Sequence, residues 1–163
     1  MISVEEYLAS SFRPDCDYVD GHVEERNLGE RTHSRIQGRL VICLGQYEAS
    51  AGIEVLPEVR VQVKPTRFRV PDICIVLGEP GEEILTKPPF LCIEILSPED
   101  RMSRIKERID DYLAMGVACV WVLDPQTTQA YWATSTEELT EVKNGVLRTE
   151  NPVLEVPLAE IFR

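Results

Sequence analysis

Residues 68–96 read FRVPDICIVLGEPGEEILTKPPFLCIEIL and contain two apolar runs, each interrupted by a single acid. Residues 68–77 and 90–96 are apolar on both faces, as expected of central strands that are covered on two sides. Asp72 lies in the first run and Glu94 in the second. If the two strands are neighbours, the alternation of side chains along a strand lets both carboxylates project into one pocket.

This carboxylate pair is open to two interpretations. An ionised carboxylate is costly to bury alone, so each needs a cation, a hydrogen-bond network or a metal ion. Two hard oxygen ligands from adjacent strands suit Mg²⁺ or Mn²⁺, and such a metal activates water and neutralises charge on a phosphodiester. The alternative is that the acids only form ion pairs or face solvent at a strand edge, and position alone does not decide.

The segments before residue 68 predict two short N-terminal elements and a longer helix. Ser3 can cap a short helix that runs to Leu8, and residues 17–24 read as a hairpin around Asp20-Gly21. Apolar residues then recur at helical spacing, with Thr32 or Ser34 as the cap and Gly52 as the end. Residues 58–64 alternate strictly between valine and polar side chains, which indicates a half-buried strand.

After the second apolar run, the pattern predicts a helix and further strands. Residues 97–115 form the helix, which opens at Ser97 and ends at Gly116. Residues 118–123 read as another buried strand, and edge strands follow, including a hairpin at Asn144-Gly145. The order helix-strand-strand-strand-helix-strand predicts an α/β (α+β) fold with a central mixed sheet flanked by helices. We expect a single domain over residues 1–163.

Composition excludes several classes of protein. The chain is 44% hydrophobic and 28% charged, which is typical of a globular protein rather than a disordered one. No apolar run approaches the ~20 residues of a membrane-spanning helix, and the first residues lack the pattern of a signal peptide. The five cysteines are odd in number and form no C-x-x-C pair, so neither disulfides nor zinc is expected. We therefore expect a cytoplasmic protein that does not associate with membranes.

A net charge of −11 argues against a nucleic-acid partner, but its distribution weakens that argument. Residues 58–108 contain nine basic and nine acidic side chains and are neutral. All of the excess negative charge lies in the two flanking segments. DNA therefore stays among the expected partners.

Four segments in this order resemble the Uma-type family of bacterial endonucleases. They are 70–72 (Val-Pro-Asp), 93–98 (Ile-Glu-Ile-Leu-Ser-Pro), 112–117 (Tyr-Leu-Ala-Met-Gly-Val) and 120–125 (Val-Trp-Val-Leu-Asp-Pro). The family belongs to the PD-(D/E)XK restriction-endonuclease-like superfamily, and the similarity covers nearly the whole chain. It implies a restriction-endonuclease-like core, cleavage of DNA, Mg²⁺ or Mn²⁺ as cofactor, and Asp72 and Glu94 as metal ligands.

The resemblance also implies a catalytic cation, and here the sequence departs from the superfamily pattern. Leu96 stands where the superfamily motif has its lysine. In the Uma-type branch a lysine of the following helix takes its place, and that position is Arg108 here, with Lys106 two residues earlier. Arginine can orient water or steady phosphate charge, but it effectively never releases its proton. Both Arg108 and Lys106 remain candidates for assisting the attack of water.

Further polar residues could support such a site, although a solvated surface is the alternative for each. Glu58, Gln62 and His33 are possible accessory groups. The possible phosphate contacts are Arg60, Lys64, Arg67, Arg69, Arg101 and Arg104. Tyr112 and Trp121 are expected in the core, and Asp110-Asp111 is expected to face solvent.

Three functions are compatible with these residues. The first is a Mg²⁺-dependent DNA endonuclease. The second is a binding module that keeps the nuclease fold with attenuated catalysis, and the third is a structural protein in which the two acids only pair with arginines. A homodimer would suit the first, because cutting both strands calls for two symmetry-related sites.

Overall fold

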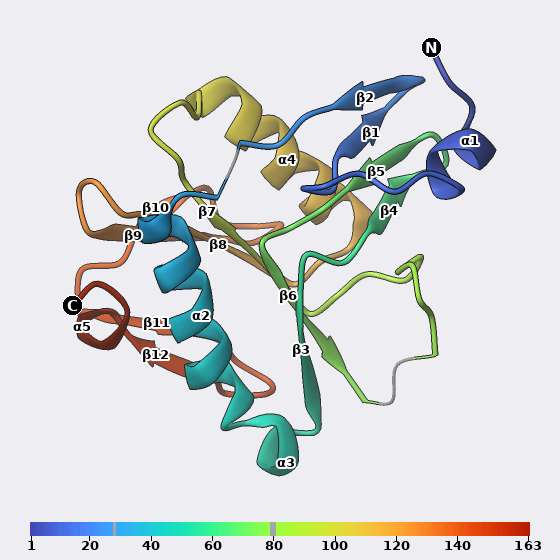
Figure 1. Cartoon of the computed structure of the whole chain (residues 1–163). Helices are drawn as coiled ribbons and strands as arrows, with labels where there is room; N and C mark the ends of the chain where they lie inside the picture. The colour runs from blue at the N-terminus through green and yellow to red at the C-terminus, as the bar shows by residue number, and fades with distance from the viewer. Residues whose placement is uncertain (28, 79–80) are drawn as a thin grey trace.

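A computed structural model of the chain describes residues 1–27, 29–78 and 81–163, and its centre is a six-stranded mixed sheet (Figure 1). The strand order is β10-β9-β8-β7-β6-β3, and only β7 and β8 are parallel neighbours. These strands are β3 (Ile53–Pro57), β6 (Ile73–Leu77), β7 (Leu91–Ile95), β8 (Cys119–Asp124), β9 (Gln129–Ala133) and β10 (Thr140–Glu141). All five residues of β7 are buried, which agrees with its prediction as a central strand.

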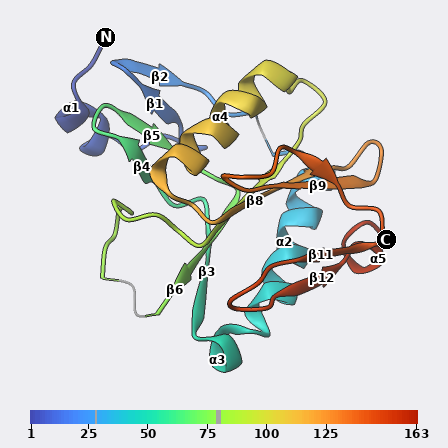
Figure 2. The same ribbon diagram turned by 180° about the vertical axis from the view of Figure 1, so that it is seen from behind.

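Both faces of the sheet are covered, and the two apolar cores lie on opposite sides of it. On one side Leu40 and Leu44 of helix α2 (Arg31–Gly45) pack against Ile73 and Ile93. The same side carries α3 (Glu48–Ala51), the two-stranded sheet of β11 (Val146–Arg148) and β12 (Glu155–Pro157), and α5 (Leu158–Ile161). On the other side Tyr112 of α4 (Met102–Met115) packs over Cys92. Figure 2, the view from behind, shows α4 on the near side and α2 beyond the strands.

A second, four-stranded sheet lies beside α4 with the order β2-β1-β5-β4. Its strands are β1 (Asp17–Val19), β2 (His22–Glu24), β4 (Val61–Lys64) and β5 (Arg67–Arg69), and α1 (Val4–Leu8) packs against it. Tyr7, Tyr18 and Phe68 form its small aromatic core. The predicted hairpin at 17–24 is confirmed, and Ser3 caps α1 through a reciprocal capping box with Glu6.

The prediction of one strand over residues 68–77 is wrong, and the difference shapes the site. It is two strands, because β5 pairs in the four-stranded sheet and β6 pairs in the six-stranded sheet. Proline has no N–H to donate to a ladder, and Pro71 lies where the chain leaves one sheet for the other. Asp72 therefore occupies the bend between the sheets, one residue before β6.

Other element boundaries differ from the predictions as well. The alternating strand begins at Val61 because Glu58 has φ of +54°, and the preceding strand β3 was not predicted. Helix α2 begins after Glu30, without a side-chain cap from Thr32 or Ser34.

The helix predicted from residue 97 begins at Met102, although its end at Gly116 is confirmed. The Ser97 N–H donates to Asp100 Oδ2 at 2.6 Å, so residues 97–100 form a turn rather than the first helical turn. Gly116 has φ of +112°, and an added Cβ would lie 3.2 Å from Pro88. This position therefore favours glycine for its backbone conformation and for its close packing.

The prediction of a hairpin at Asn144-Gly145 is also wrong. These residues connect β10, which pairs with β9, to β11, which pairs with β12. Leu147 and Val156 thereby cover the core beside α2. The predicted α+β class, with a central mixed sheet flanked by helices, is confirmed. Within the described ranges, none of the helices has the length and apolar character needed to cross a bilayer.

Candidate functional site

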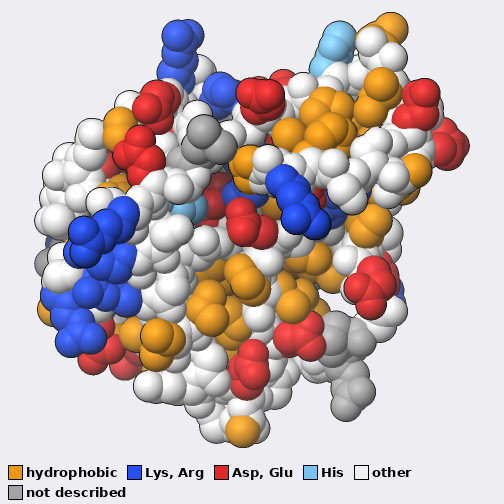
Figure 3. Space-filling model, viewed as in Figure 1, with side chains coloured by type: hydrophobic (Ala, Val, Ile, Leu, Met, Phe, Trp, Pro, Cys, Tyr) orange, Lys and Arg blue, Asp and Glu red, His pale blue; other side chains and the backbone are white. Residues whose placement is uncertain are grey.

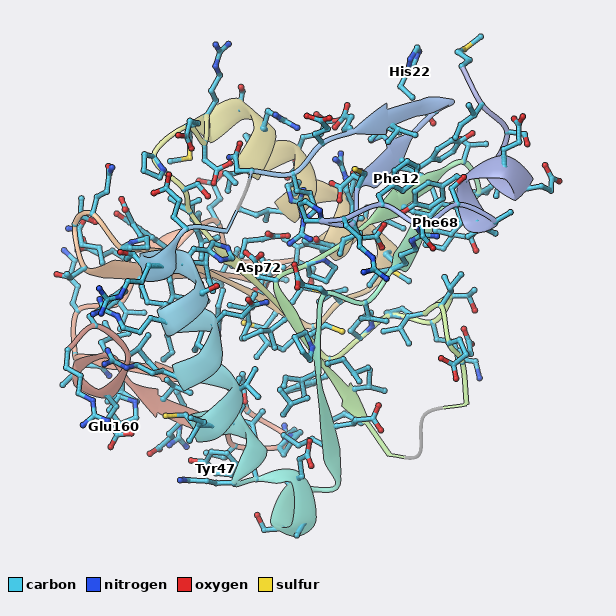
Figure 4. The ribbon with its side chains drawn as sticks, in the orientation of Figure 1. Phe12, His22, Tyr47, Phe68, Asp72 and Glu160 are labelled. Atoms are coloured by element: carbon cyan, nitrogen blue, oxygen red, sulfur yellow. The ribbon has the colours of Figure 1, made fainter. Side chains whose placement is uncertain are left out.

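Asp72 and Glu94 meet at the end of the β6–β7 pair. Ile73 is the register partner of Ile93, so continuing the antiparallel register by one residue places Asp72 opposite Glu94. Residues opposite each other on antiparallel strands share a face, as the sequence predicted for these two acids. Both are buried, with 3% and 5% of their surfaces exposed. They line one cavity of about 40 Å³. Figure 4 shows Asp72 where α2, β6 and the four-stranded sheet converge.

Asp72 is held by the side chains of Arg26 and His33. Its Oδ1 lies 2.8 Å from Arg26 Nη2 and 3.2 Å from His33 Nε2. Its Oδ2 accepts the Ile95 N–H at 2.7 Å. Burial raises the pKa of Asp72, but the hydrogen bond from His33 and the charges of His33 and Arg26 outweigh burial and hold the pKa below its ordinary value. Asp72 is therefore an anion in the folded protein.

Glu94 is held by a different set of donors. Its Oε1 accepts from Arg108 Nε at 3.1 Å, from Arg108 Nη2 at 2.9 Å and from the Tyr112 hydroxyl at 2.6 Å. Burial and the charge of Asp72 raise the pKa of Glu94 to about 7, against the opposing effects of Arg108 and Tyr112. This carboxyl can thus change protonation near neutral pH, whereas Asp72 cannot.

Arg108 is the helix cation that reaches the site. It is 9% exposed, and besides Glu94 its guanidinium donates to Asp17 Oδ2 at 2.5 Å and to the Val70 carbonyl at 3.1 Å. Lys106 instead points to solvent and pairs with Asp110 at 3.1 Å. The packing of α4 decides between the two candidates, because it buries residue 108 and leaves residue 106 in solvent.

A buried ion-pair network continues behind Arg108. Arg69 contacts Asp17 at 3.2 Å and Asp111 at 2.8 Å, and Arg67 contacts Asp111 at 3.0 Å. Asp111 is 3% exposed, so its predicted solvent exposure is wrong. Arg69 is 2% exposed, so it is not available as the predicted phosphate contact. Both errors arise because the four-stranded sheet covers this face of α4.

Two more of the predicted phosphate-contacting cations are engaged outside the cavity. Arg60 binds Asp15 at 2.8 Å and lies over the Tyr7 ring, 4.2 Å from its centroid. Lys64 is half exposed and lies 3.7 Å from Asp111. Neither lines the cavity that Asp72 and Glu94 share.

The remaining predicted residues divide between the cavity and the surface. Arg104 lines the cavity, whereas Arg101 is exposed at the start of α4. Glu58 approaches Asp72 indirectly, because Arg26 Nη1 binds it at 3.1 Å. The Gln62 side chain donates to the Pro65 carbonyl, away from the cavity. His33 is the predicted accessory residue that contacts Asp72 directly.

Three residues of this site were not assigned to it by sequence reasoning. Arg26 follows a short hairpin with no periodic pattern around it, and Asp17 lies within that hairpin. Tyr112 was predicted as core, and its ring is buried, yet its hydroxyl binds Glu94. The one available signal was that a buried tyrosine hydroxyl needs a hydrogen-bond partner.

The raised pKa of Glu94 predicts a pH-dependent stability in the presence of a chelator. Between its ordinary pKa of 4.5 and about 7, the folded state holds a proton that the unfolded chain has released. The free energy of unfolding should therefore fall as pH rises through this window. Glu94→Gln lacks this titration, so the wild type should lose stability relative to the variant over the same window. Urea unfolding at several pH values measures this, and parallel profiles would contradict it.

Comparisons with known proteins agree with this fold. No curated protein matches the chain. A solved structure described as "a putative nuclease belonging to DUF820", from Anabaena variabilis ATCC 29413, superposes with a TM-score of 0.84 at 21% identity. The match covers 99% of this chain and 98% of that one, so the two share a fold. Residues 4–160 match the family model of Uma2, described as "Putative restriction endonuclease", and the chain therefore belongs to the Uma2 family.

Proposed function

We propose that this protein is a metal-dependent DNA endonuclease that hydrolyses phosphodiester bonds at the cavity shared by Asp72 and Glu94. The observation that carries the proposal is the pair of buried carboxylates facing each other in register. The same cavity is lined by Arg26, Arg104 and Arg108, which supply positive charge for a phosphate. Membership of the Uma2 family supports the class of reaction.

The residues present fit a divalent cation such as Mg²⁺, with two carboxylates as its protein ligands. Among the described residues there is no cluster of three or more His, Cys, Asp or Glu side chains arranged for a metal. Mg²⁺, however, commonly uses only one or two carboxylates, and water and substrate phosphate complete its shell. Glu94 uses Oε1 for its donors from Arg108 and Tyr112, which leaves Oε2 for a ligand bond. Asp72 and Glu94 would hold Mg²⁺ or Mn²⁺.

The surrounding side chains then have separable tasks. A bound divalent cation supplies water activation and charge neutralisation at the phosphate. Arg108 orients Glu94 while Asp17 fixes the far side of its guanidinium, and it remains a cation throughout because arginine keeps its proton. Arg26 and Arg104 line the same cavity and would supply positive charge to a bound phosphate.

A second function has its own support, namely a binding module with attenuated catalysis. Each carboxylate is already neutralised by a guanidinium, Asp72 by Arg26 and Glu94 by Arg108. Leu96 also occupies the position of the superfamily lysine. Retained DNA binding without cleavage would favour this second function.

Plasmid cleavage separates the two functions. Supercoiled plasmid and single-stranded DNA are incubated with the protein and Mg²⁺, Mn²⁺ or chelator. We expect nicking with either metal and none with chelator. Lys106→Ala is the control, because Lys106 contacts only exposed Asp110, and its cleavage rate should equal that of the wild type. Absence of cleavage under all conditions would contradict the endonuclease, and a large loss in the control would transfer the cationic role to Lys106.

Homodimerisation is part of the same proposal. A C2 dimer would present two copies of the cavity to the two strands of a duplex. Analytical sedimentation with and without a short duplex measures the oligomeric state of the free and the DNA-bound protein.

A further inference from the structure

Helix α2 carries a row of basic side chains that the site does not use. Arg31, Arg35 and Arg39 follow one another at the four-residue spacing that places side chains on one face of a helix, and Arg163 lies beside Arg39. We call these four residues the α2 arginine stripe. Over residues 1–27, 29–78 and 81–163, no acidic side chain lies within ion-pair distance of any of them. Arg39 is anchored to the backbone, donating to the carbonyls of Ile161 and Arg163.

The stripe differs from the arginines near the cavity. Arginines near the cavity are paired with acids, Arg26 with Asp72 and Arg108 with Glu94, and the net charge is −11. Like charges one helical turn apart repel and destabilise a helix slightly. Besides burial, the charges of Arg35 and Arg163 lower the pKa of Arg39, which reflects this repulsion. The stripe thus presents uncompensated positive charge to solvent, which an external polyanion complements.

Helix α2 carries both the stripe and two side chains that contact Asp72. His33 and Gln37 lie on the opposite face of α2 and contact Asp72, so the helix links the two regions. Figure 3 shows Lys and Arg side chains gathered at the left, beside α2 and around α5, while histidine, acidic and basic side chains meet near the middle. A polyanion lying across this face would reach both.

The spacing of the stripe suits a nucleic-acid backbone. Eight residues of helix span about 12 Å at ~1.5 Å per residue. One DNA strand carries a phosphate about every 3.4 Å along the axis, so the stripe can face several phosphates of one strand. We propose that the α2 arginine stripe binds the sugar-phosphate backbone of DNA that flanks the phosphate held at the Asp72–Glu94 cavity. The choice of DNA as the polyanion rests on the proposed function, whereas the surface itself rests on the unpaired arginines.

The test measures DNA binding in chelator, where metal-dependent cleavage is absent. A short fluorescent duplex is titrated by anisotropy over a range of salt concentrations. Arg31→Gln with Arg35→Gln removes two stripe charges and leaves Arg39, which also holds the α5 end. The matched control is Arg13→Gln with Lys143→Gln, two exposed cations that lie outside α2 and make no described ion pair.

Each lost phosphate contact reduces the slope of log K against log salt by about 0.9. We expect the stripe pair to reduce the slope by about 1.8 and to weaken binding several-fold at low salt, with the control pair unchanged. Unchanged thermal midpoints show that both variants fold. An unchanged slope, an equal reduction in the control, or the absence of DNA binding by the wild type would overturn the proposal. So would a stripe-dependent self-association without DNA binding, because the partner would then be a second copy.

The outcome is separable from that of the proposed function. Stripe-dependent binding without cleavage supports the stripe and contradicts the endonuclease. Cleavage by the wild type together with an unaltered salt slope in the stripe variant supports the endonuclease and contradicts the stripe.

Discussion

Arg108→Met should destabilise the folded protein by about 3–5 kcal/mol, the usual cost of removing one partner from a buried ion pair. Methionine replaces much of the volume but none of the charge, so Glu94 and Asp17 both lose their bonds to the guanidinium. Arg69 still contacts Asp17, whereas Glu94 keeps only the Tyr112 hydroxyl. Most of the loss should therefore come from Glu94.

Urea unfolding at several pH values measures this loss and tests its cause. Protonation of Glu94 removes the unpaired charge, so the destabilisation should be larger at about pH 8 than at about pH 5. Adding Glu94→Gln to the variant should recover part of the lost stability. Lys106→Met is the control on the same helix and should change stability by less than about 0.5 kcal/mol. If Arg108→Met also changed stability by less than about 0.5 kcal/mol, the ion pairs of Arg108 would contribute little to the stability of the fold.

Asp72→Asn should reduce metal-dependent cleavage by more than about 100-fold. Disturbing an outer partner of a metal ligand typically costs 10–100-fold, and Asp72 is proposed as a ligand itself. Asparagine is nearly the same size and can still accept the Ile95 N–H, so the bend between the two sheets can persist. Its amide group, however, supplies no charge to Arg26 or His33, so some loss of stability is expected as well.

Two measurements separate loss of metal from loss of fold in Asp72→Asn. Calorimetric titration with Mn²⁺ should show binding to the wild type and none to the variant. Mn²⁺ should also raise the thermal midpoint of the wild type only, since a ligand stabilises the state that binds it. Glu58→Gln, which removes the other carboxylate on Arg26, is the comparison and should keep Mn²⁺ binding. Cleavage that persists in Asp72→Asn would place the metal elsewhere.

The sequence predicted the facing acids because their signal is local. Each acid interrupts an apolar run, and the two-residue period of strands determines which face it occupies. The cap at Ser3 and the glycine at the end of α4 were predictable for the same reason, since each depends on residues within one helical turn. The change of sheet at Pro71 was not, because both sides of it are apolar and extended.

The partners of the acids depend on contacts that no local pattern contains. Arg26 is 46 positions from Asp72, and Arg108 is 91 positions from Asp17. Which cation neutralises which carboxylate follows from how the two sheets and α4 pack together. The solvent exposure predicted for Asp111 failed for this reason, because a helix face that reads as polar is covered by charged residues of another layer.

The position of Asp72 in the bend between the two sheets makes its ionic contacts depend on how the two layers stay together. The four-stranded layer contributes Asp17 and leads into Arg26, whereas Glu94 belongs to the six-stranded sheet and His33 to the helix beneath it. The layer's apolar core is a small aromatic cluster, while the larger sheet is buried on both faces. Regions with fewer buried contacts open first when a protein fluctuates. We therefore expect the four-stranded layer to open before the six-stranded sheet, which would separate Asp17 and Arg26 from Glu94 and His33 while most of the chain stays folded.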